Sequence, residues 1–202
     1  LATTIRHDIG LGILITLSYL VHRIATDSDR KNLHLVAGLI AGFGLFTHYH
    51  AIAFGPALLI GLYAPYYVGQ IKQGKWLPQR EIVLFAIGGL IGAGIVFLVQ
   101  ILPQISAVIG VREFRSPAEI SGFVTSFFDY IGVLAELSQF EFLLILAGVV
   151  GLLIRRTLVD IQILLMIVLG HIGVSILAAH VTLEYYIIQI ATFYAIAIVT
   201  LF

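Results

Sequence analysis

Seven long apolar stretches, separated by short polar segments, constrain this chain more than any other feature. A helix needs about 20 apolar residues to cross the hydrocarbon core of a bilayer. Of the 202 residues, 60% are hydrophobic and 11% are charged, against about 25% charged in an ordinary soluble domain. The core of a single domain of this length cannot bury so much apolar surface. Soluble globular and disordered proteins are therefore excluded, and the sequence predicts an all-α polytopic bundle of transmembrane helices.

The apolar stretches divide the chain into about seven expected spans within a single transmembrane domain, residues 1–202. They cover residues 9–25, 33–49, 51–68, 82–102, 139–154, 158–178 and 185–202. The first residue is Leu1 rather than Met, and the last residues stop inside an apolar run. We therefore expect the chain to be a fragment of a longer membrane protein.

The basic residues indicate the orientation of these spans. Eight of the eleven fall at one set of helix ends: Arg23, Arg30, Lys31, Lys72, Lys75, Arg80, Arg155 and Arg156. The other three, Arg6, Arg112 and Arg115, fall at the opposite set. Because cytoplasmic loops carry an excess of Lys and Arg, the first set is predicted to be cytoplasmic. The N-terminal end, the 47–50 turn, the 103–138 segment and the 179–184 turn then face outward.

The 103–138 segment is the one long connection between the expected spans. Ser116 and Pro117 resemble a helix start, and the apolar residues that follow recur every three or four positions. The segment is either an amphipathic helix on the outer membrane surface or a connecting loop that rests on lipid.

Two pairs of glycines have the spacing of close helix packing in membranes. Gly38 and Gly42 form one GxxxG pattern, and Gly88 and Gly92 form another. Small residues at this spacing let two helix backbones approach closely, so these positions are predicted to be packing faces rather than sites of chemistry.

Polar residues able to do chemistry collect at the ends predicted to face outward. They are Arg6, His7, Asp8, His48, His50, His180 and Glu184, with Tyr185 adjacent. A carboxylate can accept a proton from a hydroxyl group, and Arg or His can neutralise a phosphate. The alternative is that these residues only cap helices or solvate turns. His22 and His34 fall at the cytoplasmic ends, where we expect no function.

The middle of the membrane is nearly bare of polar residues in this layout. A transporter would place them there, on broken helices, whereas only His171 and Gln162 lie at that depth. His171 is either functional or satisfied by a neighbouring helix. The pattern favours chemistry at the outer surface on a lipid-linked phosphate; a transporter or a non-catalytic subunit of a membrane complex is the alternative.

Three stretches carry a resemblance to GT-C-type membrane glycosyltransferases, which include protein O-mannosyltransferase-like and aminoarabinose-transferase-like enzymes. AGLIAGFGLFTHYHAIAFGPALLIGLY (37–63) resembles a family segment with a glycine-rich helix, a Thr-Lys-aromatic turn and an apolar helix with a Pro. IRHDIGLGILITLSYLVHR is similar to the Arg-x-Asp or Arg-x-Glu step into a long helix. EYYIIQIATFYAI (184–196) is similar to a Tyr-Tyr-Leu-x-Pro-like stretch. The chain departs from the family at His48, which replaces the Lys, and at Gln189-Ile190, where a Pro is usual.

The resemblance implies transfer of a sugar from a polyprenyl-phosphate donor to an acceptor at the outer face of the cell membrane, plasma or inner. The principal catalytic acid of such enzymes lies in an outward loop upstream of the region matched here. Asp8 is then the catalytic candidate in this chain. Arg6, His7, His48 and His50 are candidates for binding the donor phosphate, and His180, Glu184 and Tyr185 are candidates for lining the cavity. We expect no metal or other cofactor and no nucleic-acid partner; the partners are the bilayer and the lipid-linked donor.

Overall fold

The structure is a computed structural model that describes residues 2–47, 50–72, 79–105, 128–129, 132, 139–177 and 189–201, with side chains described from Ile9 onward except at Gly69, Gln70, Val174 and Leu177. The helices are α1 (Ala2–Asp27), α2 (Leu33–Phe43), α3 (Ala51–Ile71), α4 (Arg80–Val96), α7 (Gln139–Arg155), α8 (Leu158–Leu177) and α9 (Ala191–Val199). A 3-10 turn, η1 (Gly44–Phe46), extends α2. A π-helical turn, η2 (Phe97–Ile101), and a 3-10 turn, η3 (Leu102–Gln104), extend α4. Within these residues every regular element is helical, so the all-α prediction is confirmed.

Three helices are long and apolar enough to cross a membrane. They are Ile9–Asp27, Ala51–Val68 and Arg80–Gln104, and the apolar helices Leu33–Phe46 and Leu158–Gly173 are shorter. Much of their apolar surface is exposed: Leu90 is 74% and Ile154 is 75% accessible. Aliphatic side chains so exposed on a helical bundle suit contact with lipid rather than water, which agrees with the predicted transmembrane character.

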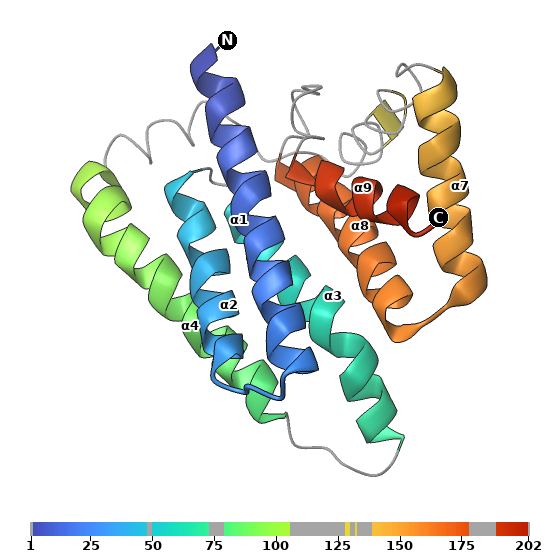
Figure 1. The fold of residues 1–202 in the computed structure, drawn as a ribbon. Helices are drawn as coiled ribbons and strands as arrows, with labels where there is room; N and C mark the ends of the chain where they lie inside the picture. Colours follow the sequence, from blue (N-terminus) through green and yellow to red (C-terminus); the bar gives the residue numbers. More distant parts are fainter. Residues whose placement is uncertain are drawn as a thin grey trace.

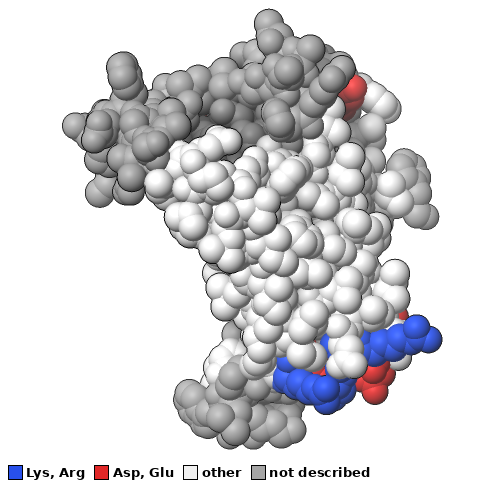
Figure 2. All heavy atoms as spheres, turned by 90° about the vertical axis from the view of Figure 1, so that its left-hand side faces the viewer, with Lys and Arg blue, Asp and Glu red and all other residues white. Residues whose placement is uncertain are grey.

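The helices α1 to α4, α7 and α8 alternate in direction, as the predicted layout requires (Figure 1). The helix ends that are connected from α1 to α2, from α3 to α4 and from α7 to α8 all lie low in this view. Seven of the eight basic residues predicted to lie together fall in or beside these connections: Arg23, Arg30, Lys31, Lys72, Arg80, Arg155 and Arg156. We call this end of the bundle the basic end. Figure 2 shows Lys and Arg gathered there on one face, below a broad uncharged surface.

The last expected span differs from the structure. Among the residues described in 185–202, the α-helix is α9, which has nine residues. At a rise of about 1.5 Å per residue it is about 13 Å long, less than half the thickness of a hydrocarbon core. In Figure 1 it runs across α8 rather than along it. The described part of this segment is therefore not a full transmembrane helix.

The tightest packing joins α2 and α4 through the glycines that the sequence singled out. A β-carbon added to Gly38 would lie less than 3.0 Å from the carbonyl oxygen of Phe85, and one added to Gly88 would lie as close to that of Leu35. Gly42 and Gly92 are equally restricted, against Gly89 and Leu39. The prediction that both GxxxG patterns are packing faces is confirmed, and the two patterns face each other.

The core joins the first four helices to α8 and α9. Phe54 and Leu62 of α3, Met166 of α8 and Phe193 of α9 are fully buried in one apolar cluster. Gly61 lets α3 approach α8, because a β-carbon there would meet the sulfur of Met166. Helix α3 thereby connects the basic end to the segments that carry the predicted outward site.

The regular α-helical pattern of α4 ends before Pro103. Because Pro103 has no N–H, the carbonyl oxygen of Val99 loses its α-helical partner. The preceding turn widens instead, and the N–H of Leu102 bonds to the carbonyl oxygen of Phe97, as in a π-helix. The amphipathic helix expected within 103–138 lies almost entirely outside the described residues.

Candidate functional site

Most of the predicted outward site lies outside what the structure describes. Arg6, His7 and Asp8 belong to the first turns of α1, but their side chains are not described. His48, His180, Glu184 and Tyr185 lie outside the described residues. The structure therefore places the side chain of one predicted site residue, His50.

His50 is fully buried just before α3. Its Nδ1 donates to Oε1 of Gln189, 3.2 Å away and 139 residues later in the chain. Two segments that the sequence analysis placed at the outward end thus meet through a buried hydrogen bond.

Two further contacts join the same segments to α1. A β-carbon placed on Gly10 would lie 3.1 Å from Cγ2 of Thr47, so α1 passes close to the turn before His50. Further along α1, the hydroxyl group of Thr16 lies 2.8 Å from the hydroxyl group of Thr192 in α9. The part of α1 that contains Gly10 and Thr16 therefore lies beside Thr47 and the start of α9.

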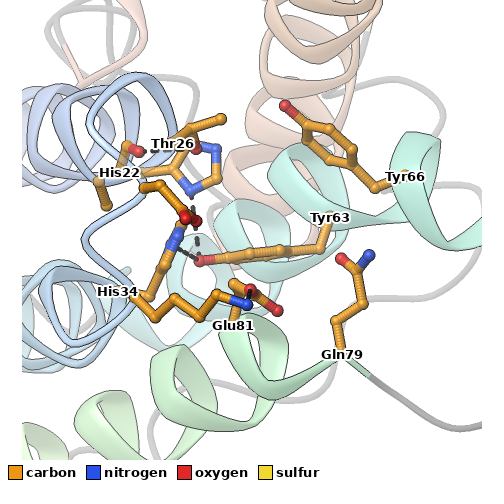
Figure 3. A pocket seen from close by; sticks show the side chains of 10 residues that line it. His22, Thr26, His34, Tyr63, Tyr66, Gln79 and Glu81 are labelled. Carbon is orange, nitrogen blue, oxygen red and sulfur yellow. Dashed lines mark hydrogen bonds and ion pairs between the residues drawn. The ribbon is translucent and has the colours of Figure 1, made fainter.

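A second polar cluster, at the basic end, was not predicted. Three helices each contribute one buried side chain to it: His22 from α1, His34 from α2 and Tyr63 from α3 (Figure 3). Nδ1 of His34 lies 2.8 Å from the hydroxyl oxygen of Tyr63, and Nδ1 of His22 lies 3.2 Å from it. We call these three residues the His-Tyr-His cluster.

The hydrogen bonds of the His-Tyr-His cluster restrict its protons. A phenol has one hydrogen to donate, so Tyr63 donates to at most one of the two imidazoles and accepts from at least one. When both rings are neutral, at least one of them therefore carries its proton on Nδ1. Nε2 of His22 is buried without a hydrogen-bond partner among the described residues.

A small polar cavity of about 190 Å³ adjoins this cluster. Its wall includes the cluster itself, Thr26, Tyr66 and Gln79, and it also includes Lys31 and Glu81, which form an ion pair of 3.2 Å. These groups can donate and accept hydrogen bonds, and the cavity is smaller than the pockets of about 300–1,000 Å³ that hold typical organic ligands.

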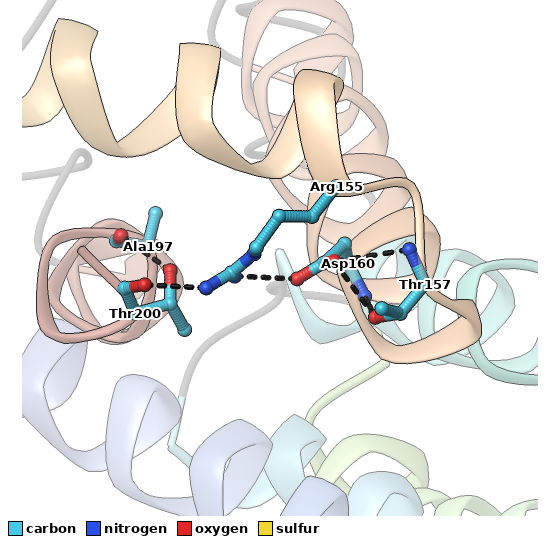
Figure 4. Close-up of polar contacts among 5 residues, drawn as sticks. All are labelled: Arg155, Thr157, Asp160, Ala197 and Thr200. Carbon is cyan, nitrogen blue, oxygen red and sulfur yellow. Dashed lines mark hydrogen bonds and ion pairs between the residues drawn. The ribbon is translucent and has the colours of Figure 1, made fainter. Parts of the chain in front are cut away.

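A third polar cluster ties the ends of α7, α8 and α9 together (Figure 4). Asp160 is buried and accepts hydrogen bonds from Arg155 at 2.7 Å and from the backbone and hydroxyl of Thr157 at 3.0 and 2.7 Å. Arg155 also donates to the carbonyl oxygen of Thr200. Thr157 and Asp160 have the spacing of a capping box at the start of α8, so this cluster is structural.

His171 has a partner on a neighbouring helix. It is buried in α8, and its Nε2 forms a hydrogen bond with the hydroxyl group of Tyr194 in α9. Of the two alternatives for this residue, the structure supports a histidine that another helix satisfies. Within the described part of the chain, no three His, Asp or Glu side chains gather in a way that could hold a metal ion.

The His-Tyr-His cluster could not be recognised from the sequence, because its members are 12 to 41 residues apart and meet only when α1, α2 and α3 pack. The one available signal was that both histidines fall near helix ends on the basic side.

The chain was compared with known protein families, curated proteins and solved structures, and none of the three comparisons gives a significant match.

Proposed function

We propose that this chain is part of a membrane glycosyltransferase that transfers a sugar from a polyprenyl-phosphate donor to an acceptor at the outer face of the membrane. The observation that carries the proposal most is the buried hydrogen bond between His50 and Gln189. It joins two of the three stretches, 37–63 and 184–196, that resemble the GT-C-type enzymes.

The contact between Gly10 and Thr47 also supports a site in which the candidate residues lie together. Asp8 precedes Gly10 by two residues, and His48 follows Thr47, while Gly10 and Thr47 are neighbours. Two candidate residues are thus close in sequence to a pair of residues that lie together, away from the basic end. Arginine and histidine there would bind the donor phosphate, and the prenyl chain would remain in the bilayer.

The proposal also states how the chain is oriented in the membrane and which carboxylates take part in catalysis. The first six expected spans cross the membrane with the basic end in the cytoplasm, as the excess of Lys and Arg indicates. Among the residues of this chain, Asp8 is the one that exchanges a proton with the acceptor or the leaving group. The family resemblance implies a further catalytic carboxylate in an outward loop of the enzyme.

Sugar transfer by the full-length protein tests the proposal. The protein is reconstituted in liposomes with radiolabelled mannose or aminoarabinose on a polyprenyl phosphate, and labelled acceptor is counted. Because general acid–base catalysis contributes about 100-fold or more, Asp8→Asn is expected to lower the rate by at least about that factor.

The matched control is Asp27→Asn, which removes a carboxylate at the basic end, where Asp27 is exposed and pairs with Arg23. It is expected to transfer sugar at the wild-type rate. If Asp8→Asn also works at the wild-type rate at equal expression, Asp8 has no catalytic role. If the wild-type protein transfers none of the donors but takes up solutes into liposomes, it is a transporter.

A further inference from the structure

An open groove of about 490 Å³ lies at the basic end. Its walls come from the connection between α1 and α2 and from the first residue of α4. The residues that line it are Asp29, Arg30, Lys31, Asn32, Leu33 and Arg80. We call it the basic groove.

The local sequence fixes the position of the basic groove. Asp29 has φ of 52° and ends α1 in the left-handed region, which Asp tolerates better than most residues. The N–H of Arg30 bonds to the carbonyl oxygen of Ala25 at 3.0 Å, and the N–H of Asp29 bonds to that of Thr26 at 3.4 Å, as in a Schellman motif. The chain then turns sharply, and Arg80 bridges the two walls by donating to Oδ1 of Asn32 at 3.4 Å.

The two arginines that line the basic groove differ from three other cations at the basic end, which are Arg23, Lys31 and Arg155. Arg23 pairs with Asp27 at 2.9 Å, Lys31 with Glu81 at 3.2 Å, and Arg155 with Asp160 at 2.7 Å. Arg30 and Arg80, in contrast, form no ion pair with any carboxylate that the structure describes. The groove therefore holds two unneutralised guanidinium groups beside one carboxylate, that of Asp29.

An exposed apolar stripe begins directly beyond the groove. Val83, Ile87 and Leu90 of α4 are exposed and follow Arg80 by three, seven and ten residues, which places all four on one side of the helix. Figure 2 shows the charged residues at the lower edge of this uncharged surface.

We propose that the basic groove binds the phosphate of an anionic phospholipid. Guanidinium groups match the paired oxygens of a phosphate, so Arg30 and Arg80 hold it, and the acyl chains lie along the α4 stripe. The stripe favours a lipid over a soluble phosphate. The net positive charge of the groove favours an anionic headgroup over one that carries its own ammonium group.

Lipid binding to the full-length protein in detergent tests this proposal by native mass spectrometry. The probes are phosphatidylglycerol, phosphatidylcholine with the same acyl chains, and soluble glycerol phosphate. We expect saturable binding of phosphatidylglycerol, and a loss of about tenfold or more in apparent affinity in Arg30→Gln/Arg80→Gln, because both phosphate contacts are removed. The single variant Arg80→Gln is expected to lose part of that affinity.

The matched control is Arg23→Gln/Arg156→Gln, which removes the same charge at the basic end but outside the groove. It is expected to keep the wild-type affinity. An equal loss in both double variants would show general attraction to the basic end and overturn the proposal. Equal affinity for phosphatidylcholine would overturn the preference for an anionic headgroup. Glycerol phosphate that binds as tightly as the lipid would overturn the choice of a lipid.

Discussion

The hydroxyl group of Tyr63 satisfies two buried imidazoles at once. It lies 2.8 Å from Nδ1 of His34 and 3.2 Å from Nδ1 of His22. Because the three residues belong to three helices, this one oxygen atom connects α1, α2 and α3 at the basic end. We interpret the cluster as a structural connection, since it lies far along the bundle from the proposed site.

Tyr63→Phe is expected to destabilise the protein. The substitution keeps the ring and removes the hydroxyl group, which leaves Nδ1 of both imidazoles without its partner. A buried polar group left unsatisfied costs about 1–3 kcal/mol, so the unfolding temperature of the full-length protein in detergent, followed by circular dichroism, should fall. Tyr66→Phe is the control, because Tyr66 lines the same cavity without joining the two histidines. Equal unfolding temperatures for the two variants would contradict the interpretation.

Asp160→Asn is expected to destabilise the protein more than Asp27→Asn. Asp160 is buried and accepts three hydrogen bonds, one of them from Arg155, and hydrogen bonds to a charged group contribute about 1.5–3 kcal/mol each. Asp27 pairs with Arg23 on an exposed helix surface, where such pairs contribute about 0.3–0.5 kcal/mol. The same thermal measurement compares the two. A larger effect at Asp27 would be inconsistent with the role of Asp160.

At the scale of single residues the sequence predicted little of the polar clusters. It identified His50 as an outward polar residue, but the buried partner Gln189 is 139 residues away. For His22 and His34 the sequence indicated only a place near helix ends on the basic side, because neither their spacing nor their neighbours form a motif. Contacts between helices depend on packing that a pattern along one helix does not contain.

At the scale of elements, α4 is held to the bundle chiefly by backbone contact with α2. Gly38 and Gly42 of α2 face Gly88 and Gly92 of α4, with carbonyl oxygens of each helix against the glycines of the other. The GxxxG spacing predicted which faces pack, since small residues permit close approach. That the two patterns face each other required the structure, because the spacing alone does not name the partner helix.

Gly88→Ala is expected to lower the unfolding temperature, whereas Gly94→Ala leaves it unchanged or raises it. A β-carbon on Gly88 would collide with the carbonyl oxygen of Leu35, whereas one on Gly94 meets nothing within 4 Å. Overpacking costs about 1–3 kcal/mol, and alanine is favoured over glycine in a helix by up to about 1 kcal/mol. Both variants change one residue of the same helix in the same way. If Gly88→Ala were as stable as Gly94→Ala, the close packing of α2 and α4 would be wrong.

At the scale of the whole molecule, hydropathy and charge predicted most of the architecture. Six of the seven expected spans coincide with helices or with helices extended by short turns, and their alternation brings the basic residues to one end. The seventh differs, because α9 covers nine residues and runs across α8. An apolar stretch predicts that a segment avoids water, but it does not distinguish a helix that crosses the bilayer from one that packs obliquely inside it.

The central claim is that the two ends of the bundle face opposite sides of the membrane, with the basic end in the cytoplasm. The chain has no cysteine, so single cysteines can report this directly. Ser28→Cys and Gln139→Cys place them at exposed positions on the basic end and at the start of α7. In intact cells that express the full-length protein, a membrane-impermeant maleimide should label Gln139→Cys and should label Ser28→Cys only after the cells are opened. Labelling of Ser28→Cys in intact cells, or of both positions from the same side, would contradict the account.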